Sequence, residues 1–339
     1  MKQIVNILFI ILFLSAYGLA EMKKVGQSGM TYLAVSLGAR ESAMADASVA
    51  SVEGVKGLLH NPGALTELKG LGMTFNQVKW IADTDIYGIG LAYSTGRFGT
   101  IGLDLVYMDY GTITGTRRVD RSVDPRGYAI TGGINVDEYA IGFGYAYPVS
   151  DRFSFGGKVK FVHEDLGKAP IAVSVIDAEN GVFEYDERSW ALSHWGFDFG
   201  ARYAVGFHDL VFAVAFQNYS TDMKYWAEEF TLPLVLRMGL AMDVLKLFQP
   251  ADAPFALNIA IDALHPKDYT ERLHLGAEFL YKDMFALRGG YKFNYDVENF
   301  SFGLGFKFDL AGYAASIDYA YTNAEYFGHI DRFGMQFSF

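Results

Sequence analysis

The stretch DRFGMQFSF, residues 331–339, alternates apolar and polar side chains to its last residue. The apolar side chains take every second position: Phe333, Met335, Phe337 and Phe339. Successive side chains of a β-strand point to opposite faces, so a period of two predicts a strand. From Phe333 onwards one face of this strand is apolar, and the fold depends on which solvent that face meets.

The same period recurs along most of the chain. It is clear in EYAIGFGYAYP (138–148), PLVLRMGLAM (233–242) and NFSFGLGFKFDL (299–310). Collecting such segments predicts about fourteen strands of roughly ten residues, the length of a tilted strand that crosses a membrane. We expect them near residues 71–80, 86–94, 100–110, 138–147, 153–163, 191–205, 209–219, 233–242, 255–264, 272–281, 284–294, 300–308, 313–322 and 331–339.

The composition excludes several classes of protein. The chain of 339 residues is 51% hydrophobic and 16% aromatic, with 37 glycines. A formal charge of -11 argues against a nucleic-acid partner, which needs a basic surface. The absence of cysteine excludes a disulfide framework and thiolate chemistry.

The first residues predict export. MKQIVNILFIILFLSAYGLAEMKK has a positive start, an apolar run from Ile4 to Leu14 and small residues before Ala20. This is typical of a secretory signal peptide, which we place at residues 1–20; the alternative is an uncleaved anchor. No other stretch approaches the ~18 apolar residues that a membrane-spanning helix needs.

The connections between strands support a barrel. In an outer-membrane barrel, turns on the periplasmic side are short and external loops are longer. Alternation places the two longest loops, 111–137 and 164–190, on the same external side, and most connections on the other side are short. The longer connection there, residues 243–254, is expected to contain a helical turn that Pro250 closes.

The two faces of the strands differ. One is rich in Leu, Ile, Val, Phe and Tyr, and the other carries Gly, Ala and charges of both signs. The charged positions are Asp104, Lys158, Lys160, Asp198, Arg202, Arg237, Asp262, Glu278, Arg288, Lys292, Lys307 and Asp318. This suits a barrel with lipid outside and paired or solvated charges inside. The alternative is a large periplasmic β-sandwich.

Residues 21–70 lack the barrel pattern. The alanine-rich stretch 38–54 predicts a short helix that stops at Gly54, and Pro62 with Gly63 predicts a tight turn. We therefore predict an all-β membrane protein, a ~14-stranded antiparallel transmembrane β-barrel (71–339) with a small helical hatch (21–70) in its lumen. The alternative for this segment is a periplasmic extension that plugs nothing.

The segment before the barrel carries a family resemblance. GQSGMTYLAVSLGARESAMADASVASVEGVKGLLHNPGALTEL resembles the N-terminus of the PorV/PorQ family, a branch of the FadL-like outer-membrane barrels. The matching positions are Gly29, Tyr32, Leu33, Gly38, Ala39, Arg40, Ala43, Met44, Asp46, Ala47, Ala50, Asn61 and Pro62. The chain departs from the pattern at Ala45, at His60 and in the order of Gly63, Ala64 and Leu65.

The resemblance implies two functions. The first is a non-enzymatic component of type IX secretion or surface attachment, which binds secreted or surface proteins through loops 111–137 and 164–190. The alternative is FadL-like transport of a hydrophobic small molecule or fatty acid, bound in the lumen, gated by the hatch and released sideways through a strand defect. The hatch motif that would serve either function is Arg40, Met44, Asn61, Pro62 and Gly63.

Catalytic patterns are absent from the sequence. GIG, GFG and GLG lie inside expected strands with no following helix, so they fail as nucleotide-binding loops. The seven histidines have no metal-ligand spacing, and we expect no metal, no cofactor and no enzymatic activity. Glu278, Asp262 and Asp198 are expected to form salt bridges with Arg288, Arg237 and Arg202. An outer-membrane enzyme and an open porin remain more distant alternatives.

These observations predict an integral protein of the bacterial outer membrane. Its expected partners are outer-membrane lipid and the barrel-assembly machinery, with no nucleic acid. The alternating apolar residues Phe333, Met335, Phe337 and Phe339, with the terminal aromatic, resemble the signal that this machinery reads. Deleting Phe339 is expected to impair membrane insertion more than any activity of assembled protein.

Overall fold

The wall of the molecule is a closed barrel. The computed structural model describes residues 26–177, 182–250 and 253–339. Antiparallel strands pair around a full circle and number fourteen, which confirms the predicted fold class. They are β1 (Leu71–Lys79), β2 (Asp85–Ser94), β3 (Thr100–Asp109), β6 (Asp137–Pro148), β7 (Phe153–Asp177), β8 (Val182–Ala204), β9 (Val211–Tyr219), β12 (Val235–Asp243), β13 (Phe255–Pro266), β14 (Arg272–Tyr281), β15 (Phe285–Phe293), β16 (Phe300–Leu310), β17 (Tyr313–Asn323) and β18 (His329–Ser338).

The last strand closes the barrel on the first. β18 pairs with β1 in a continuous register from Gly72 opposite Ser338 to Lys79 opposite Asp331. Phe339 extends the ladder, because its backbone N–H donates to the Leu71 carbonyl at 2.8 Å. Closure satisfies the hydrogen-bonding groups of both edge strands, as an apolar surrounding requires.

The faces of the strands are divided as the period of two predicts. Outward positions such as Phe143, Leu304 and Phe302 are exposed, whereas their neighbours Gly142 and Gly303 are buried. The exterior is therefore apolar along the strands, and the interior combines small residues with charges.

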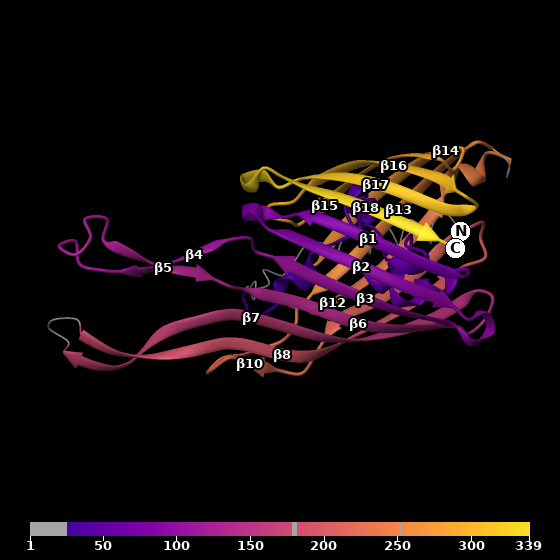
Figure 1. Ribbon diagram of the computed structural model, residues 1–339. Coiled ribbons are helices and arrows are strands. Elements are labelled where there is room, and N and C mark those ends of the chain that lie inside the picture. Colours follow the sequence, from indigo (N-terminus) through magenta and orange to yellow (C-terminus); the bar gives the residue numbers. More distant parts are fainter. Residues whose placement is uncertain (1–25, 178–181, 251–252) are drawn as a thin grey trace, which may run out of the picture.

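Two long hairpins project from one end of the barrel (Figure 1). One is formed by β4 (Ile113–Arg118) and β5 (Tyr128–Ile134), and the other by the extended parts of β7 and β8. We call this the hairpin end. The sequence predicted loops at 111–137 and 164–190, but both segments contain paired strands that form these hairpins. Residues 178–181 of the second segment lie outside the described residues. Phe339 lies at the opposite end, which we call the C-terminal end (Figure 1).

Smaller elements complete the connections. β10 (Met223–Lys224) pairs with β11 (Glu229–Phe230) at the hairpin end. Short 3-10 turns follow four strands: η4 (Ile81–Asp83), η5 (Gly96–Phe98), η6 (Val244–Leu247) and η7 (Glu325–Phe327). η6 is the helical turn expected in residues 243–254, and it ends before Pro250. No helix among the described residues is long and apolar enough to cross a membrane.

Residues 28–68 lie inside the barrel, and we call them the lumenal segment (Figure 1). The segment contains η1 (Thr31–Ala34), α2 (Ala39–Ala43), η2 (Gly54–Leu58) and η3 (Pro62–Glu67). The α-helix ends far before Gly54, because Ala45 and Asp46 adopt left-handed backbone conformations. Gly54 instead begins η2. The predicted signal peptide at residues 1–20 lies outside the described residues.

Candidate functional site

The interior of the barrel has two zones. Towards the hairpin end, inward residues are mainly aliphatic: Val78, Ile86, Val106, Met108, Ala140, Val162 and Ile330. We call this zone the apolar mouth. Below it, towards the C-terminal end, charged side chains of the wall meet the lumenal segment. We call this zone the charged belt, defined by Arg40, Lys56, Glu278, Arg288 and Asp318.

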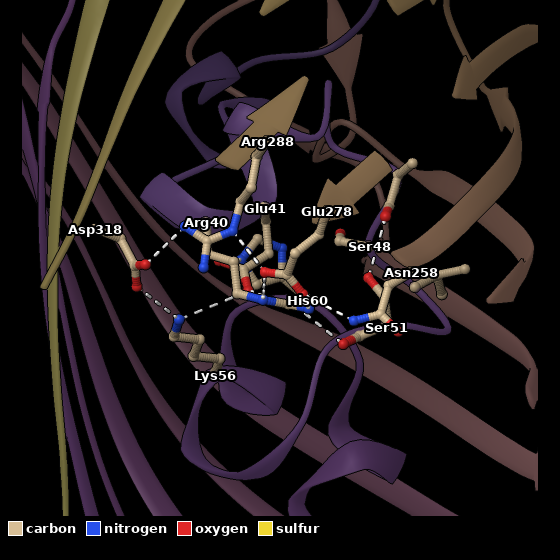
Figure 2. Close-up of polar contacts among 12 residues, drawn as sticks. Arg40, Glu41, Ser48, Ser51, Lys56, His60, Asn258, Glu278, Arg288 and Asp318 are labelled. Carbon is tan, nitrogen blue, oxygen red and sulfur yellow. Dashed lines mark hydrogen bonds and ion pairs between the residues drawn. The ribbon is translucent and has the colours of Figure 1, made fainter. Parts of the chain in front are cut away.

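The charged belt is a continuous chain of ion pairs (Figure 2). Arg40 donates to both carboxylate oxygens of Glu278 at 3.0 and 2.8 Å. Arg288 bridges Glu278 at 2.6 Å and Asp318 at 2.8 Å. Lys56 reaches Asp318 at 3.3 Å. Two cations of the chain's own N-terminal segment are thus held by carboxylates of β14 and β17.

Glu41 lies beside this chain and is fully buried. Arg40, Lys56 and His60 surround its carboxylate at 3.5–3.9 Å. Burial by itself would raise the pKa of the Glu41 carboxyl, but the charges of Lys56, His60 and Arg40 outweigh burial and lower that pKa to about 2. Burial lowers the pKa of His60, only partly opposed by Glu41. Arg40 and Lys56 therefore keep Glu41 ionised at neutral pH, and the charge of His60 adds to their effect only when its imidazole is protonated.

Further polar contacts attach the lumenal segment to the wall. Lys292 of β15 pairs with Asp46 at 2.5 Å, and Asp262 of β13 accepts from the backbone N–H groups of Ser48 and Val49 at 2.7 and 2.8 Å. Burial tends to raise the pKa of Asp46, but Lys292 and then Arg332 hold it well below its ordinary value. The segment is anchored from several strands at once.

Only one of the three predicted salt bridges is present. Glu278 pairs with Arg288 as expected. Asp262 has no ion pair with Arg237 among the described residues; it accepts instead from the backbone N–H groups of Ser48 and Val49, because the lumenal segment lies against β13 there. Asp198 pairs with Lys158 and Lys160. Arg202 lies nearer the C-terminal end and pairs with Glu67 at 2.5 Å.

Glycines of the wall make room for the lumenal segment. A Cβ at Gly290 would lie 2.5 Å from the Met44 backbone, and one at Gly276 would lie as close. A Cβ at Gly156 would lie 2.5 Å from the Pro62 backbone. At these three inward glycines, the backbone of the segment contacts the strands directly.

The first part of the lumenal segment occupies the apolar mouth. Met30, Tyr32 and Leu37 are buried against its aliphatic residues, and Leu232 from the β11–β12 connection joins them. The segment is held there by Gly29, whose N–H donates to the Thr231 carbonyl at 3.1 Å. An apolar ligand entering from the hairpin end would meet this packing first.

One break in register interrupts the body of the wall. The β8–β9 pairing shifts between Phe197 and Phe199, while the other described pairs shift only in the projecting hairpins. Opposite the break, Asn218 has a φ of 63°, which non-glycine residues rarely adopt. Its N–H donates to Asp198 at 2.7 Å, and its side chain donates to the carbonyls of Pro233 and Leu33 at 3.0 and 3.4 Å. The break is a β-bulge tied directly to the lumenal segment.

The predicted hatch motif is placed in two groups. Arg40 is part of the charged belt, and Met44 packs on Gly276 and Gly290. Asn61, Pro62 and Gly63 lie against β7 and β8, where the Asn61 amide donates to the carbonyls of Val49 at 2.9 Å and Ala201 at 3.4 Å. The neighbouring His60 carbonyl accepts from Gln217 at 2.9 Å, so this turn lies beside the register break. The role of the motif stays a prediction.

The predicted assembly residues lie away from both zones. Phe333, Met335 and Phe339 are exposed on the outer face, and Phe337 is half-buried there. Arg332 of the same strand points inward, is buried, and donates to the Ser36 carbonyl at 3.0 Å. Recognition of Phe333, Met335, Phe337 and Phe339 by the barrel-assembly machinery stays a prediction.

The sequence reasoning missed several residues of the site. Glu41, Lys56 and Asn218 were not singled out, although each is buried and polar. Glu41 and Lys56 lie in a segment without strand periodicity, so nothing showed that they face charges of the wall. Asn218 carried one signal, since Gln217 and Asn218 end the apolar alternation of β9.

Polar space remains at the C-terminal end of the lumen. A cavity of about 550 Å³ is lined by belt residues and by Lys307, Gln336 and Ser338. In the mouth, the cavity between the lumenal segment and β3, β6, β7 and β9 is only about 50 Å³. The chain itself therefore leaves little space beside residues 32–37, whereas the C-terminal end of the lumen holds a larger cavity.

Comparisons with known proteins identify the fold. The sequence matches no model of a known protein family and no curated protein. Among solved structures, the CymD monoaromatic hydrocarbon channel is 14% identical, with a TM-score of 0.57 over 92% of this chain and 99% of that one. The Ralstonia pickettii toluene transporter TbuX is 14% identical, with a TM-score of 0.55 over 89% and 98%. A Pseudomonas aeruginosa FadL homologue is 10% identical, with a TM-score of 0.52 over 90% and 97%.

These similarities show that the chain has a FadL-like barrel fold. They support that part of the predicted resemblance, and nothing in them supports the narrower PorV/PorQ assignment. The titles of the first two name a channel and a transporter. The expectation that this chain is not an enzyme stays a prediction.

Proposed function

We propose that the protein is an outer-membrane channel for hydrophobic small molecules. The observation that carries the proposal is the apolar mouth, a buried aliphatic zone inside a barrel whose lower lumen is charged. An apolar zone of this kind favours an apolar ligand, because burial of apolar area is the main source of such affinity. The titles of two similar structures name a monoaromatic hydrocarbon and toluene, which makes small aromatic compounds the first class to test.

In this proposal, the hairpin end faces outwards and the ligand replaces residues 30–37 in the mouth. That part of the lumenal segment contains one short 3-10 turn and packs mainly by apolar contacts. The charged belt is fixed by ion pairs and glycine contacts, so it stays in place and blocks a straight path. The chain then works as a gated channel and not as an open pore.

The exit is proposed at the register break between β8 and β9. Asn218 links the break to the Leu33 carbonyl, so displacement of Leu33 by a ligand would release one of the bonds that close the break. The wall beside it carries exposed Phe197 and Phe199, which face the membrane in this orientation. An apolar molecule could pass sideways into lipid without crossing the charged belt.

Uptake experiments with proteoliposomes test this function. Full-length protein is expected to accelerate entry of radiolabelled toluene over empty liposomes, whereas a polar solute of similar size, such as glycerol, is not accelerated. Asn218→Gly keeps the left-handed backbone but removes the contacts to Leu33 and Pro233, and it is expected to change the toluene rate severalfold while binding persists. Equal rates with and without protein would contradict the proposal.

A second candidate function is attachment of secreted or surface proteins. One observation favours it: the two hairpins project well beyond the barrel (Figure 1). Removing residues 113–134 would separate the two functions. If the protein is an attachment component, the shortened chain loses partner capture under gentle detergent, whereas a channel keeps toluene uptake.

A further inference from the structure

Two glutamates lie side by side at the rim of the apolar mouth. Glu138 of β6 and Glu164 of β7 are directly opposite each other in the strand pairing. Both side chains point inwards and both residues are buried, with 3% and 7% of their surface exposed. Like charges directly opposite each other are unfavourable, so this placement needs a compensating interaction.

The described part of the chain supplies no cation for this pair. Neither carboxylate has an ion pair with Lys, Arg or His among the described residues; the interactions recorded are with tyrosines and with each other. The Tyr225 hydroxyl donates to Glu164, and the Tyr110 hydroxyl interacts with Glu138. Elsewhere in the lumen, Glu278, Asp198 and Asp318 each have a cationic partner. Asp262 has no ion pair among the described residues either, but it accepts from two backbone N–H groups, whereas Glu138 and Glu164 face each other.

A third tyrosine points to a ligand. Tyr32 is 3% exposed, and its hydroxyl has no hydrogen-bond partner. Burial, followed by the charges of Glu138 and Glu164, raises the pKa of this hydroxyl above its ordinary value, which places it near both carboxylates. A buried hydroxyl without a partner costs about 1–3 kcal/mol, so the Tyr32 hydroxyl would gain from a polar partner in the mouth.

Aromatic rings complete the surroundings. The Tyr225 ring stacks on Phe230 at 5.6 Å between centroids and meets Trp190 edge-on at 6.0 Å. Arg188 lies over the Trp226 ring at 3.9 Å, so one ring of this cluster already binds a cation. Carboxylates with aromatic faces are the chemistry that recognises organic ammonium groups.

We propose that Glu138 and Glu164 bind the ammonium group of an apolar amine, whose hydrocarbon part occupies the adjacent apolar mouth. The inference rests on the proposed channel function and names its ligand class. The ammonium donates to both carboxylates and the Tyr32 hydroxyl turns towards them or the ligand, while the hydrocarbon part displaces Leu33 and Val35, which pack against the mouth. A ligand carboxylate would be repelled at the same point.

A matched set of three probes tests the inference. 4-Phenylbutylamine, butylbenzene and 4-phenylbutyrate share one skeleton and differ in charge. Binding to the full chain in non-ionic detergent is followed by tryptophan fluorescence, because Trp190 and Trp226 lie at the rim. The amine is expected to bind at least about tenfold more tightly than the acid, about 1.4 kcal/mol.

The double variant E138Q/E164Q keeps side-chain size and removes both charges. It is expected to bring the affinities of amine and acid to within about threefold, mainly by weakening the amine. E228Q changes an exposed glutamate at the same end and is the matched control. It is expected to keep the wild-type ratio of amine affinity to acid affinity. Unchanged electrophoretic heat-modifiability shows that each barrel is folded.

The outcomes separate the inference from the function on which it rests. Butylbenzene binding with equal affinity for amine and acid would overturn the inference and leave the channel function standing. An equal loss of selectivity in E228Q would also overturn the inference, since the selectivity would then come from the overall negative charge at this end of the barrel. Failure of all three probes to bind would overturn the channel function itself.

Discussion

The apolar mouth and the charged belt lie in one barrel and hold parts of one segment, yet they hold them differently. Residues 30–37 pack in the mouth by apolar contacts, with few hydrogen bonds to the wall. Residues 40–63 are fixed by ion pairs, by backbone N–H groups of the segment that donate to Asp262, and by close contact with glycines of the wall. Ion pairs and tight backbone contacts depend on geometry, whereas an apolar surface accepts any occupant of suitable size.

This difference assigns separate tasks to the two zones. A ligand can replace apolar contacts with contacts of its own, so the mouth can exchange its occupant at small cost. Removing the belt residues from the wall would leave several buried charges without partners, which costs far more. The same segment can therefore be mobile at one end and fixed at the other.

The largest effect is expected from Arg288→Met, which removes the central cation of the belt. Glu278 and Asp318 would share the remaining Arg40 and Lys56, and breaking a buried pair in this way costs about 3–5 kcal/mol. We expect the seating of the lumenal segment to weaken, with a lower thermal transition and larger conductance in planar bilayers. Arg97→Met, at an exposed turn, is the control; equal behaviour of the two variants would show that the belt does not hold the segment.

A smaller effect is expected from Gly290→Val. Its Cβ would lie 2.5 Å from the Met44 backbone, and overpacking of this kind costs about 1–3 kcal/mol. The neighbouring Gly289→Val is the matched control, because the nearest atom to its Cβ is 3.8 Å away. Protease sensitivity of residues 40–50 is expected to rise in the first variant only. Similar sensitivity in both would mean that the segment does not depend on close backbone contact.

The belt is also expected to respond to pH through His60. The pKa of His60 is lowered in the folded protein, so protonation of its imidazole opposes folding. The stability that the neutral imidazole contributes is therefore lost as pH falls below about 6.5, the ordinary pKa of histidine. The loss is at most about 1.4 kcal/mol per pH unit. Glu41, with a pKa of about 2, remains charged in this range. Conductance should therefore rise between pH 7.5 and 5.5 in the wild type, and His60→Gln should flatten the profile; a parallel rise in both would exclude His60 as the cause.

The sequence predicted the strands of the wall better than the contacts inside the lumen. The strands follow from a period of two, which depends only on neighbours in the chain, and the predicted ranges agree with the strands except where β7 and β8 extend into hairpins. The partners of Asp262 and Asp198 depend on how strands and segment align in space. Asp262 binds backbone N–H groups some two hundred residues away, and no local pattern encodes that contact.

The smallest effect is expected in the mouth, from Tyr32→Phe. The Tyr32 hydroxyl is buried without a partner, so removing it is expected to leave stability unchanged or raise it by about 1 kcal/mol. Tyr225→Phe is the contrasting variant, because it removes a donor from Glu164 and should lower stability by about 1–3 kcal/mol. Thermal transitions of the two variants, measured without ligand, test this difference. If Tyr32→Phe is the more destabilising, its hydroxyl has a structural partner in the free protein, and the mouth is as tightly built as the belt.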